Sequence, residues 1–361
     1  MEFVLIGVAL SLAFGNGAND NFKGFATVWG SATLGYRPAL TLATLATVAG
    51  SLASLALAGT LSEQFSGRGL VPDAIAGTPG FVFTVGLAAA ITVWLATRLG
   101  LPVSTTHALI GGLVGAGLGL AGSDVQLSQL AGLFLLPLLA SPLLAATLGV
   151  LALRSLRLRP AEDCACVVVP APAAGDAGAG ALKFSEATAP SVRIGTDAQC
   201  RALPGVAARF SLARLADHAH IFSATLICFA RGVNDTPKLA ALLLAGQVLD
   251  ATPAVFAIAA VMAAGGVLQA RRVAVTMSRR VSRMDASQGL AANLITATLV
   301  LLASKLGLPV STTHVSVGAI AGVGAGGGGV DWVVARAIAL AWGATLPLAA
   351  AIAWLAALLL R

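Results

Sequence analysis

Two pairs of opposite charges lie at matching places in apolar stretches of the chain. Asp20 is followed three residues later by Lys23, and Asp235 is followed in the same way by Lys238. This spacing places both side chains of a pair on one face of a helix. A charged side chain in an apolar segment that crosses a membrane costs about 3 kcal/mol, so it marks a functional site by default. We expect each lysine to face an anion and each aspartate to hold a cation or a proton. A local ion pair that only holds a broken helix together is the alternative.

Six hydroxyl residues form a second set of candidates. They belong to a nine-residue stretch, LGLPVSTTH, that occurs without a change at 99–107 and at 306–314. Proline cannot donate a backbone hydrogen bond and serine is a favoured N-cap, so each copy predicts a break followed by a new helix. The N–H groups at that helix end and the hydroxyls would form a cradle for an anion, whereas a capped helix with back-bonded hydroxyls is the alternative. The hydroxyl residues are Ser104, Thr105, Thr106, Ser311, Thr312 and Thr313.

Each copy of this stretch ends in a histidine, His107 in the first and His314 in the second. Two roles stay open for them, a proton relay and an ordinary polar residue satisfied by hydrogen bonds. The sequence has no His-Glu-x-x-His pattern, so we predict neither catalytic residues nor a metal centre.

The two motifs occur in the same order in both halves of the chain. G-x-N-D-x-x-K covers 17–23 and 232–238, with Asn19 and Asn234 before the aspartates, and the nine-residue stretch follows in each half. The halves therefore derive from one duplicated unit. Catalysis needs groups in unlike roles, so this symmetric duplication argues against an enzyme embedded in the membrane.

The composition is that of an integral membrane protein. The chain has 361 residues, of which 57% are hydrophobic and 10% charged, and its mean hydropathy is +0.90. Soluble domains carry about a quarter charged residues. The apolar runs reach the roughly 20 residues that a helix needs to cross a bilayer, and they do not alternate as barrel strands do. Residues 1–15 lack a basic stretch and a cleavage site, so we expect the first segment to stay in the folded protein.

We predict about ten apolar segments in an all-α fold of two repeats. The repeats are expected at 1–153 and 219–361, separated by a linker or insert at 154–218. The segments that carry the motifs should be broken or re-entrant helices; they are 2–28, 104–122, 219–246 and 311–328. The other six segments are 39–60, 80–98, 127–153, 251–270, 286–304 and 332–360.

Basic residues predict which side of the membrane the loops face. Short loops rich in arginine lie on the cytoplasmic side, so the net charge of +7 indicates orientation and not a nucleic-acid partner. This rule places the central loop in the cytoplasm and both termini outside. An odd number of crossings in each repeat then makes the repeats inverted, with the substrate site near the bilayer midplane. The arginines are Arg154, Arg157, Arg159, Arg201, Arg209, Arg214, Arg271, Arg272, Arg279, Arg280 and Arg283.

The central loop contains three of the four cysteines, Cys164, Cys166 and Cys200. Their spacing is not a recognised zinc pattern and does not make a disulfide framework. The favoured interpretation is ordinary reduced cysteines in a weakly structured cytosolic insert, with short strand-like pieces. A soft-metal site or a redox sensor is the alternative.

The paired motifs in two inverted halves resemble those of the inorganic phosphate transporter (PiT) family of secondary carriers. The likeness covers nearly the whole chain apart from 154–218. It implies a carrier in the cell membrane whose central site binds phosphate together with sodium ions, with no cofactor other than the coupling ion. A homodimer is implied by the resemblance alone. The matching positions are Asn19, Asp20, Ser104, Thr105, Thr106, Asn234, Asp235, Ser311, Thr312 and Thr313.

One departure from the family pattern bears on coupling. The family signature G-A-N-D-V-A-N-A has a second asparagine where this chain has Lys23, and Lys238 stands in the same place in the other half. An amide oxygen can coordinate a hard cation, whereas an ammonium occupies such a site with its own charge. We therefore expect the lysines to replace one or both sodium ions, with coupling to protons or a weaker dependence on sodium. Sulfate or another oxyanion such as arsenate stays open as the substrate, as does a passive anion channel.

Overall fold

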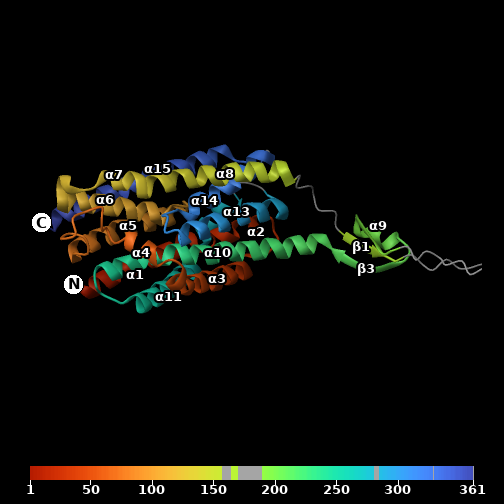
Figure 1. Ribbon diagram of the computed structural model, residues 1–361, viewed down its shortest axis with the longest axis horizontal. Helices are drawn as coiled ribbons and strands as arrows, with labels where there is room; N and C mark the ends of the chain where they lie inside the picture. Colours follow the sequence, from red (N-terminus) through yellow and green to blue (C-terminus); the bar gives the residue numbers. More distant parts are fainter. Residues whose placement is uncertain (157–163, 170–188, 280–283, 328, 361) are drawn as a thin grey trace, which may run out of the picture. The chain divides into compact units, whose positions relative to one another are not determined.

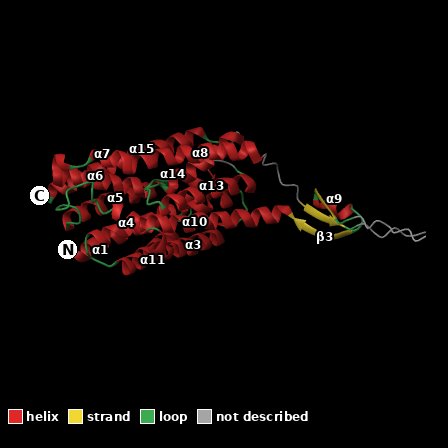
Figure 2. Cartoon of the chain, in the orientation of Figure 1, coloured by secondary structure: helices red, strands yellow, loops and turns green. Residues whose placement is uncertain are grey.

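The computed structural model describes residues 1–156, 164–169, 189–279, 284–327 and 329–360 of the chain. These residues divide into two compact units, one of Met1–Arg157 with His220–Arg361 and the other of Leu158–Ala219. Helices make up the first unit, and the strands among the described residues all lie in the second (Figures 1 and 2). Seven of the helical stretches described are long and apolar enough to cross a membrane, so the first unit has the all-α integral membrane architecture that the sequence predicts. Four arginines used for the sidedness prediction lie outside the described residues; they are Arg157, Arg159, Arg280 and Arg283.

The first half of the helical unit contains the break that the sequence predicts at its polar motif. Helix α1 (Glu2–Asp20) ends at the aspartate, and a 3-10 turn, η1 (Lys23–Phe25), leads into the short α2 (Ala26–Gly30). The second predicted break, at residues 100–104, precedes α6. The remaining elements are α3 (Tyr36–Leu57), α4 (Gly59–Gln64), α5 (Pro79–Leu99), α6 (Thr105–Ala121), η2 (Gly122–Asp124), α7 (Leu127–Gln129), η3 (Leu130–Leu135) and α8 (Leu136–Leu156).

The second half differs from the prediction at its first segment. Helix α10 (Leu212–Ala245) runs without interruption through the motif at 232–238, although Pro237 lies inside it, so the predicted break there is wrong. Proline removes only one backbone donor, and buried tertiary contacts such as Thr236 Oγ1 to Ser51 Oγ (2.7 Å) hold this turn in place. The helices that follow are α11 (Ala251–Gln269), α12 (Arg271–Arg279), α13 (Ala286–Lys305), α14 (Thr312–Gly327) and α15 (Trp332–Leu359).

The two halves exchange their last helices. α6 packs on α15, and its counterpart α14 packs on α8, so each motif helix lies against the other half of the chain. Glycines four apart allow these close crossings: a Cβ on Gly111 or Gly115 would lie 2.4 or 2.0 Å from a backbone oxygen of α15. Gly318 and Gly322 approach backbone oxygens of α8 in the same way, at 2.5 and 2.1 Å. This exchange is consistent with duplicated halves, and their inverted topology stays a prediction.

The first glycine of each G-x-N-D-x-x-K motif is required by a helix crossing. A Cβ on Gly17 would lie 1.9 Å from the Met262 carbonyl oxygen of α11, and one on Gly232 would lie 2.3 Å from the Thr47 carbonyl oxygen of α3. Because backbone atoms cannot move aside as a flexible side chain can, only glycine fits at these two positions. The motif therefore contains a packing residue beside its polar ones.

Gly17→Ala should destabilise the protein by about 2–3 kcal/mol, because the new methyl group displaces the backbone of α11. The measurement is thermal or denaturant unfolding of the purified protein in detergent. Gly7→Ala, in the same helix, is the matched control, since none of the residues that the structure describes lies within 4 Å of a Cβ there. Equal stability of the two variants would contradict the crossing as the reason for this glycine.

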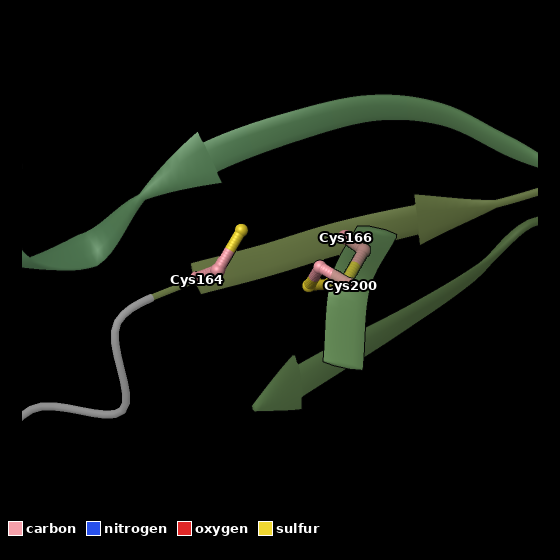
Figure 3. A group of neighbouring side chains, drawn as sticks. All are labelled: Cys164, Cys166 and Cys200. Atoms are coloured by element: carbon pink, nitrogen blue, oxygen red, sulfur yellow. A yellow bond between two sulfur atoms is a disulfide. The ribbon is translucent and has the colours of Figure 1, made fainter. Parts of the chain in front are cut away.

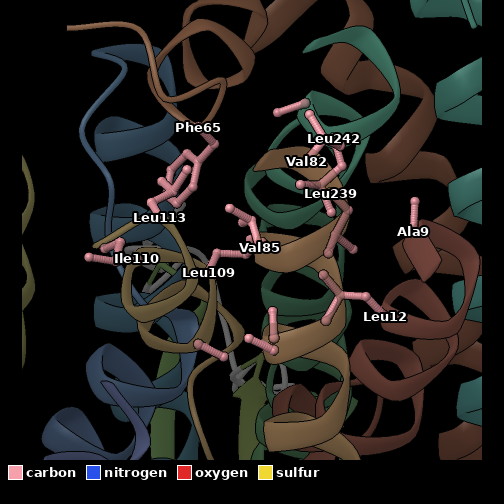
Figure 4. Close-up of a cluster of buried hydrophobic side chains, with 14 of the residues drawn as sticks. Ala9, Leu12, Phe65, Val82, Val85, Leu109, Ile110, Leu113, Leu239 and Leu242 are labelled. Carbon is pink, nitrogen blue, oxygen red and sulfur yellow. The ribbon is translucent and has the colours of Figure 1, made fainter. Parts of the chain in front are cut away.

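The largest apolar cluster of the helical unit lies between α1, α5, α6 and α10 (Figure 4). Leu12, Val85, Leu109 and Leu239 come from these four helices, and each is at most 1% exposed. Helices from both halves therefore share one core next to the polar motifs. Burial on this scale restrains the motif-bearing helices relative to each other.

The second unit is a small antiparallel sheet with one short helix. Its strands are β1 (Cys164–Val168), β2 (Ser191–Gly195) and β3 (Val206–Ser211), in the order β2-β1-β3, and α9 (Asp197–Ala202) begins with a capping box at Thr196. This described part is more regular than the predicted weakly structured insert. A disulfide joins Cys166 to Cys200, and Cys164 is free and buried (Figure 3). The expectation of three reduced cysteines is wrong here, because α9 folds over β1 and brings Cys200 onto Cys166.

Candidate functional site

The structure gathers both copies of both motifs into one buried region of the helical unit. The four charged residues Asp20, Lys23, Asp235 and Lys238 are 2–5% exposed. They come from the end of α1, from η1 and from the middle of α10. Buried charges persist only where they are paired and hydrogen-bonded. The partners of each charge therefore define what this region can bind.

Lys23 is held by oxygen atoms from both halves of the chain. Its Nζ forms an ion pair with the Asp20 carboxylate and donates to Asn19 Oδ1 at 2.8 Å. It also donates to the Val103 carbonyl oxygen (2.9 Å) and to Thr313 Oγ1 (2.7 Å). A carboxylate, an amide, a carbonyl and a hydroxyl oxygen are the ligand types that hard cations take in proteins. The ammonium thus occupies an oxygen cage suited to a cation.

Lys238 has the corresponding surroundings in the second half, with a looser ion pair. Its Nζ donates to the Val310 carbonyl oxygen at 2.7 Å and to Thr106 Oγ1 at 3.0 Å. The nearest oxygen of Asp235 is 3.9 Å away, and the Phe65 ring centre lies 5.7 Å from the ammonium. The two sites are therefore similar in their partners but unequal in the strength of their ion pairs.

The third hydroxyl of each S-T-T-H motif serves the lysine of the opposite half. Thr106 donates to the Val310 carbonyl oxygen (3.3 Å), which also accepts from Lys238, and Thr313 donates to the Val103 carbonyl oxygen (3.0 Å). Each carbonyl therefore receives one bond from a lysine of its own half and one from a threonine of the other. This exchange accounts for the same threonine in both copies, since each one serves the opposite half.

The two motif asparagines hold the breaks before α6 and α14. Asn19 donates to Thr97 Oγ1 (2.9 Å) and the Leu101 carbonyl oxygen (3.0 Å), and its Oδ1 accepts from the Val103 N–H (3.1 Å). Asn234 donates to Asp235 Oδ1 (2.9 Å) and accepts from Ser304 Oγ (3.2 Å). These contacts fix the chain that leads into each motif helix.

The serines of the two S-T-T-H motifs are helix caps, as their position predicts. Ser104 Oγ accepts from the His107 N–H at 3.1 Å, and Ser311 Oγ accepts from the His314 N–H at 3.3 Å. Thr105 donates to Asp20 Oδ2 at 3.4 Å, and Thr312 is buried at the first residue of α14. Most of the predicted cradle hydroxyls thus have protein partners in this conformation.

The two buried histidines lie against each other inside the helical unit. The ring centres of His107 and His314 are 4.4 Å apart, and Trp342 packs on His314 at 3.7 Å. Neither Nδ1 has a hydrogen-bond partner among the residues that the structure describes. A proton relay through them stays a prediction.

Two polar residues of this region were not among the sequence predictions. Asn16 donates to Asp20 Oδ2 and Thr105 Oγ1, both at 3.0 Å, and to Asp235 Oδ2 at 3.4 Å, so it connects the two aspartates. Arg231 is 2% exposed and immediately precedes Gly232 of the second motif. The detectable signal for both was a polar residue in an apolar helix, directly before a motif.

Thr106→Val should lower the free energy of unfolding by about 1–3 kcal/mol, because it leaves Lys238 and a buried carbonyl oxygen each short of one hydrogen bond. Unfolding of the purified protein in detergent measures the effect. Thr84→Val is the matched control, since Thr84 is also buried and its hydroxyl donates to the carbonyl oxygens of Gly80 and Phe81 in its own helix. A similar loss in both variants would show that any buried hydroxyl matters equally.

Comparison with known protein families gives a match over almost the whole chain. The model of the phosphate transporter family covers residues 16–353, which include all four motif copies. The chain belongs to the phosphate transporter family. It is therefore a multi-pass membrane protein of a transporter family and not an enzyme.

Curated relatives and a solved structure agree with this membership. The chain is 30% identical to the "Probable low-affinity inorganic phosphate transporter" of Mycobacterium tuberculosis, over 96% of this chain and 74% of that one. The Mycobacterium leprae protein of the same name is also 30% identical, over 97% and 75%. A solved structure titled "The sodium-dependent phosphate transporter" shares the fold, with a TM-score of 0.76, 20% identity and coverage of 99% and 98%.

Proposed function

We propose that this protein is a secondary carrier that moves inorganic phosphate across the membrane, coupled to a cation gradient. Its family and the printed names of its mycobacterial relatives support phosphate as the substrate. The observation that carries the proposal is the buried pair of Asp–Lys sites, each completed by a threonine of the opposite half. A site built from both halves can open to either side when the halves rock against each other.

The substrate ligands in this proposal are the two lysines and the hydroxyl residues of the S-T-T-H motifs. Release of Thr106 and Thr313 from their lysine and carbonyl partners would free donors for an oxyanion. The asparagines and aspartates of the G-x-N-D-x-x-K motifs would hold the positive charges of the site next to the bound anion. Sulfate and arsenate have the same tetrahedral shape and are the competing substrates.

Our proposal for the coupling ion is supported by what fills the oxygen cages. Lys23 and Lys238 each supply a positive charge where a free cation would otherwise bind. The solved structure of similar fold carries sodium dependence in its title, and this chain should depend less on sodium because its lysines substitute for the ion. We propose coupling to protons, with the histidines His107 and His314 as candidate relay residues.

We place the protein in the cell membrane with both termini outside and the central loop in the cytoplasm. The start of α1 and the end of α15 lie at one end of the helical unit, and the end of α8 lies at the other (Figure 1). Arginines follow α8 and occur along α12, where short loops favour the cytoplasm. Labelling of single cysteines introduced near each terminus, in intact cells, tests this placement. A homodimer remains a prediction from the family.

The test of function is uptake of labelled phosphate and labelled sulfate by proteoliposomes, under an imposed proton gradient or sodium gradient. Phosphate uptake that follows the proton gradient supports the proposal in full. Uptake that requires sodium leaves the carrier standing and contradicts the coupling ion. Sulfate uptake in preference to phosphate under every gradient contradicts the substrate, and currents without any driving cation indicate a channel.

A further inference from the structure

Arg231 is a fully buried arginine whose guanidinium forms no hydrogen bond with the residues that the structure describes. Its side chain is 2% exposed, and none of its three guanidinium nitrogens has a hydrogen-bond partner among the residues that the structure describes. A guanidinium carries five donors and stays charged in proteins. Burial of such a group without acceptors is costly, so its persistence points to an acceptor that binds from outside the chain.

The repeat shows where Arg231 belongs. Arg231 precedes the motif glycine of the second half as Asn16 precedes that of the first. Asn16 contacts Asp20 and reaches across to Asp235 of the other half. On α10, Arg231 lies four residues before Asp235, so the two side chains share one face of the helix. The arginine therefore belongs to the charged region between the halves.

The charge balance of this region favours an anion. Two aspartates contribute two negative charges, and the two lysines with Arg231 contribute three positive charges, so the ionised set has a net charge of +1. Without Arg231 the set would be neutral. A planar guanidinium also matches two oxygens of a tetrahedral oxyanion, which an ammonium cannot do.

We propose that the Arg231 guanidinium binds the phosphate oxygens directly and makes the site selective for an anion. This inference rests on the proposed function and adds a ligand to the same site. Arg231→Gln should raise the KM for phosphate by about 10- to 100-fold, because charge-assisted bonds are lost. Arg231→Lys keeps the positive charge but lacks the planar pair of N–H donors, and we expect the KM to rise by about 3- to 10-fold.

The experiment compares KM and kcat for phosphate uptake in proteoliposomes, with Arg37→Gln, an exposed arginine of α3, as the matched control. A raised KM in both Arg231 variants and an unchanged control supports the proposal. An unchanged KM, with or without a lower kcat, overturns it. If the glutamine variant does not fold, the lysine variant decides by the same criterion. A wild type that transports no oxyanion contradicts the proposed function itself. Failure of the proposed function can therefore be distinguished from failure of the Arg231 proposal.

The three cysteines of the second unit carry a second, independent inference. Cys164 and Cys166 lie two apart on β1 and so face the same side of the sheet, and α9 brings Cys200 over that side (Figure 3). Their sulfur atoms all lie within 4.8 Å of one another, and each residue is at most 2% exposed. Together with Leu203 and Val206 they form the apolar core of this unit.

We infer that the reduced unit binds one soft cation, such as Cd²⁺ or Cu⁺, through these three thiolates. A zinc-like ion binds sulfur at about 2.3 Å, so two sulfur ligands of one ion are at most about 4.6 Å apart. The three sulfur atoms already lie within 4.8 Å of one another, so small movements of the cysteine side chains would complete the site. A small unit with so little apolar core needs a crosslink, either a disulfide or a metal. Reduction of the disulfide takes two electrons and two protons, and binding of the cation then releases three thiol protons.

The test uses the full-length protein reduced with a water-soluble phosphine, which is oxidised to its oxide as the disulfide opens, and titrated with Cd²⁺. We expect one Cd²⁺ per chain, seen as an ultraviolet sulfur-to-metal charge-transfer band. Cys164→Ser is decisive, because it removes one metal ligand but keeps both cysteines of the Cys166–Cys200 disulfide, which can still form before reduction. It should weaken binding at least about 10-fold, whereas Cys228→Ser, in α10, should not. No band, or a band unaffected by Cys164→Ser, overturns the inference.

Discussion

Asp20→Asn should abolish phosphate uptake, reducing the rate by about 100-fold or more, and should lower the free energy of unfolding by about 3–5 kcal/mol. The carboxylate pairs with Lys23 and accepts from Asn16 and Thr105. An amide of the same size removes the counter-charge and leaves a buried ammonium without compensation. Initial uptake rates and unfolding in detergent measure the two effects.

Asp235→Asn is the matched comparison for this prediction. Its ion pair with Lys238 spans 3.9 Å, so the stability loss should be smaller than for Asp20→Asn. The double variant Asp20→Asn with Lys23→Met removes both charges and should regain much of the stability but none of the uptake. Restored uptake in the double variant would mean that the pair is only structural.

Lys23→Asn combined with Lys238→Asn should convert the carrier into a sodium-dependent one. The amide oxygens would complete the oxygen cages that the two ammonium groups now occupy, leaving room for a free ion. We expect uptake by the double variant to require a sodium gradient, and its thermal stability to rise with NaCl but not with choline chloride. A ligand that binds only the folded state raises stability by mass action, by about 2.7 kcal/mol at 100 times its Kd.

Lys305→Asn is the control for the loss of a positive charge, because this lysine is exposed at the end of α13. Sodium dependence should be absent in the control and in the wild type. A wild type that already requires sodium would show that the lysines are partners of the aspartates and do not replace the ion. The carrier proposal would survive that result, and the coupling argument would not.

Sequence patterns were sufficient to predict the helices and the candidate residues. Long apolar runs and polar motifs are local signals, so most segments were predicted within a few residues, although α10 begins at Leu212 and not at the predicted 219. The serine caps at Ser104 and Ser311 followed from position alone. The duplication also indicated that the motif residues belong together. Local chemistry and repetition therefore determined the all-α membrane fold and the region of interest.

Tertiary packing decided the rest. The exchange of Thr106 and Thr313 between halves, the role of Gly17 at a helix crossing and the continuity of α10 through Pro237 depend on distant segments. The burial of Arg231 without a hydrogen-bond partner among the described residues, and the Cys166–Cys200 disulfide, also arise only once the chain is folded. Sequence spacing describes neighbours along the chain. These features depend on atoms that are 30 or more residues apart in the sequence and come into contact only through tertiary packing.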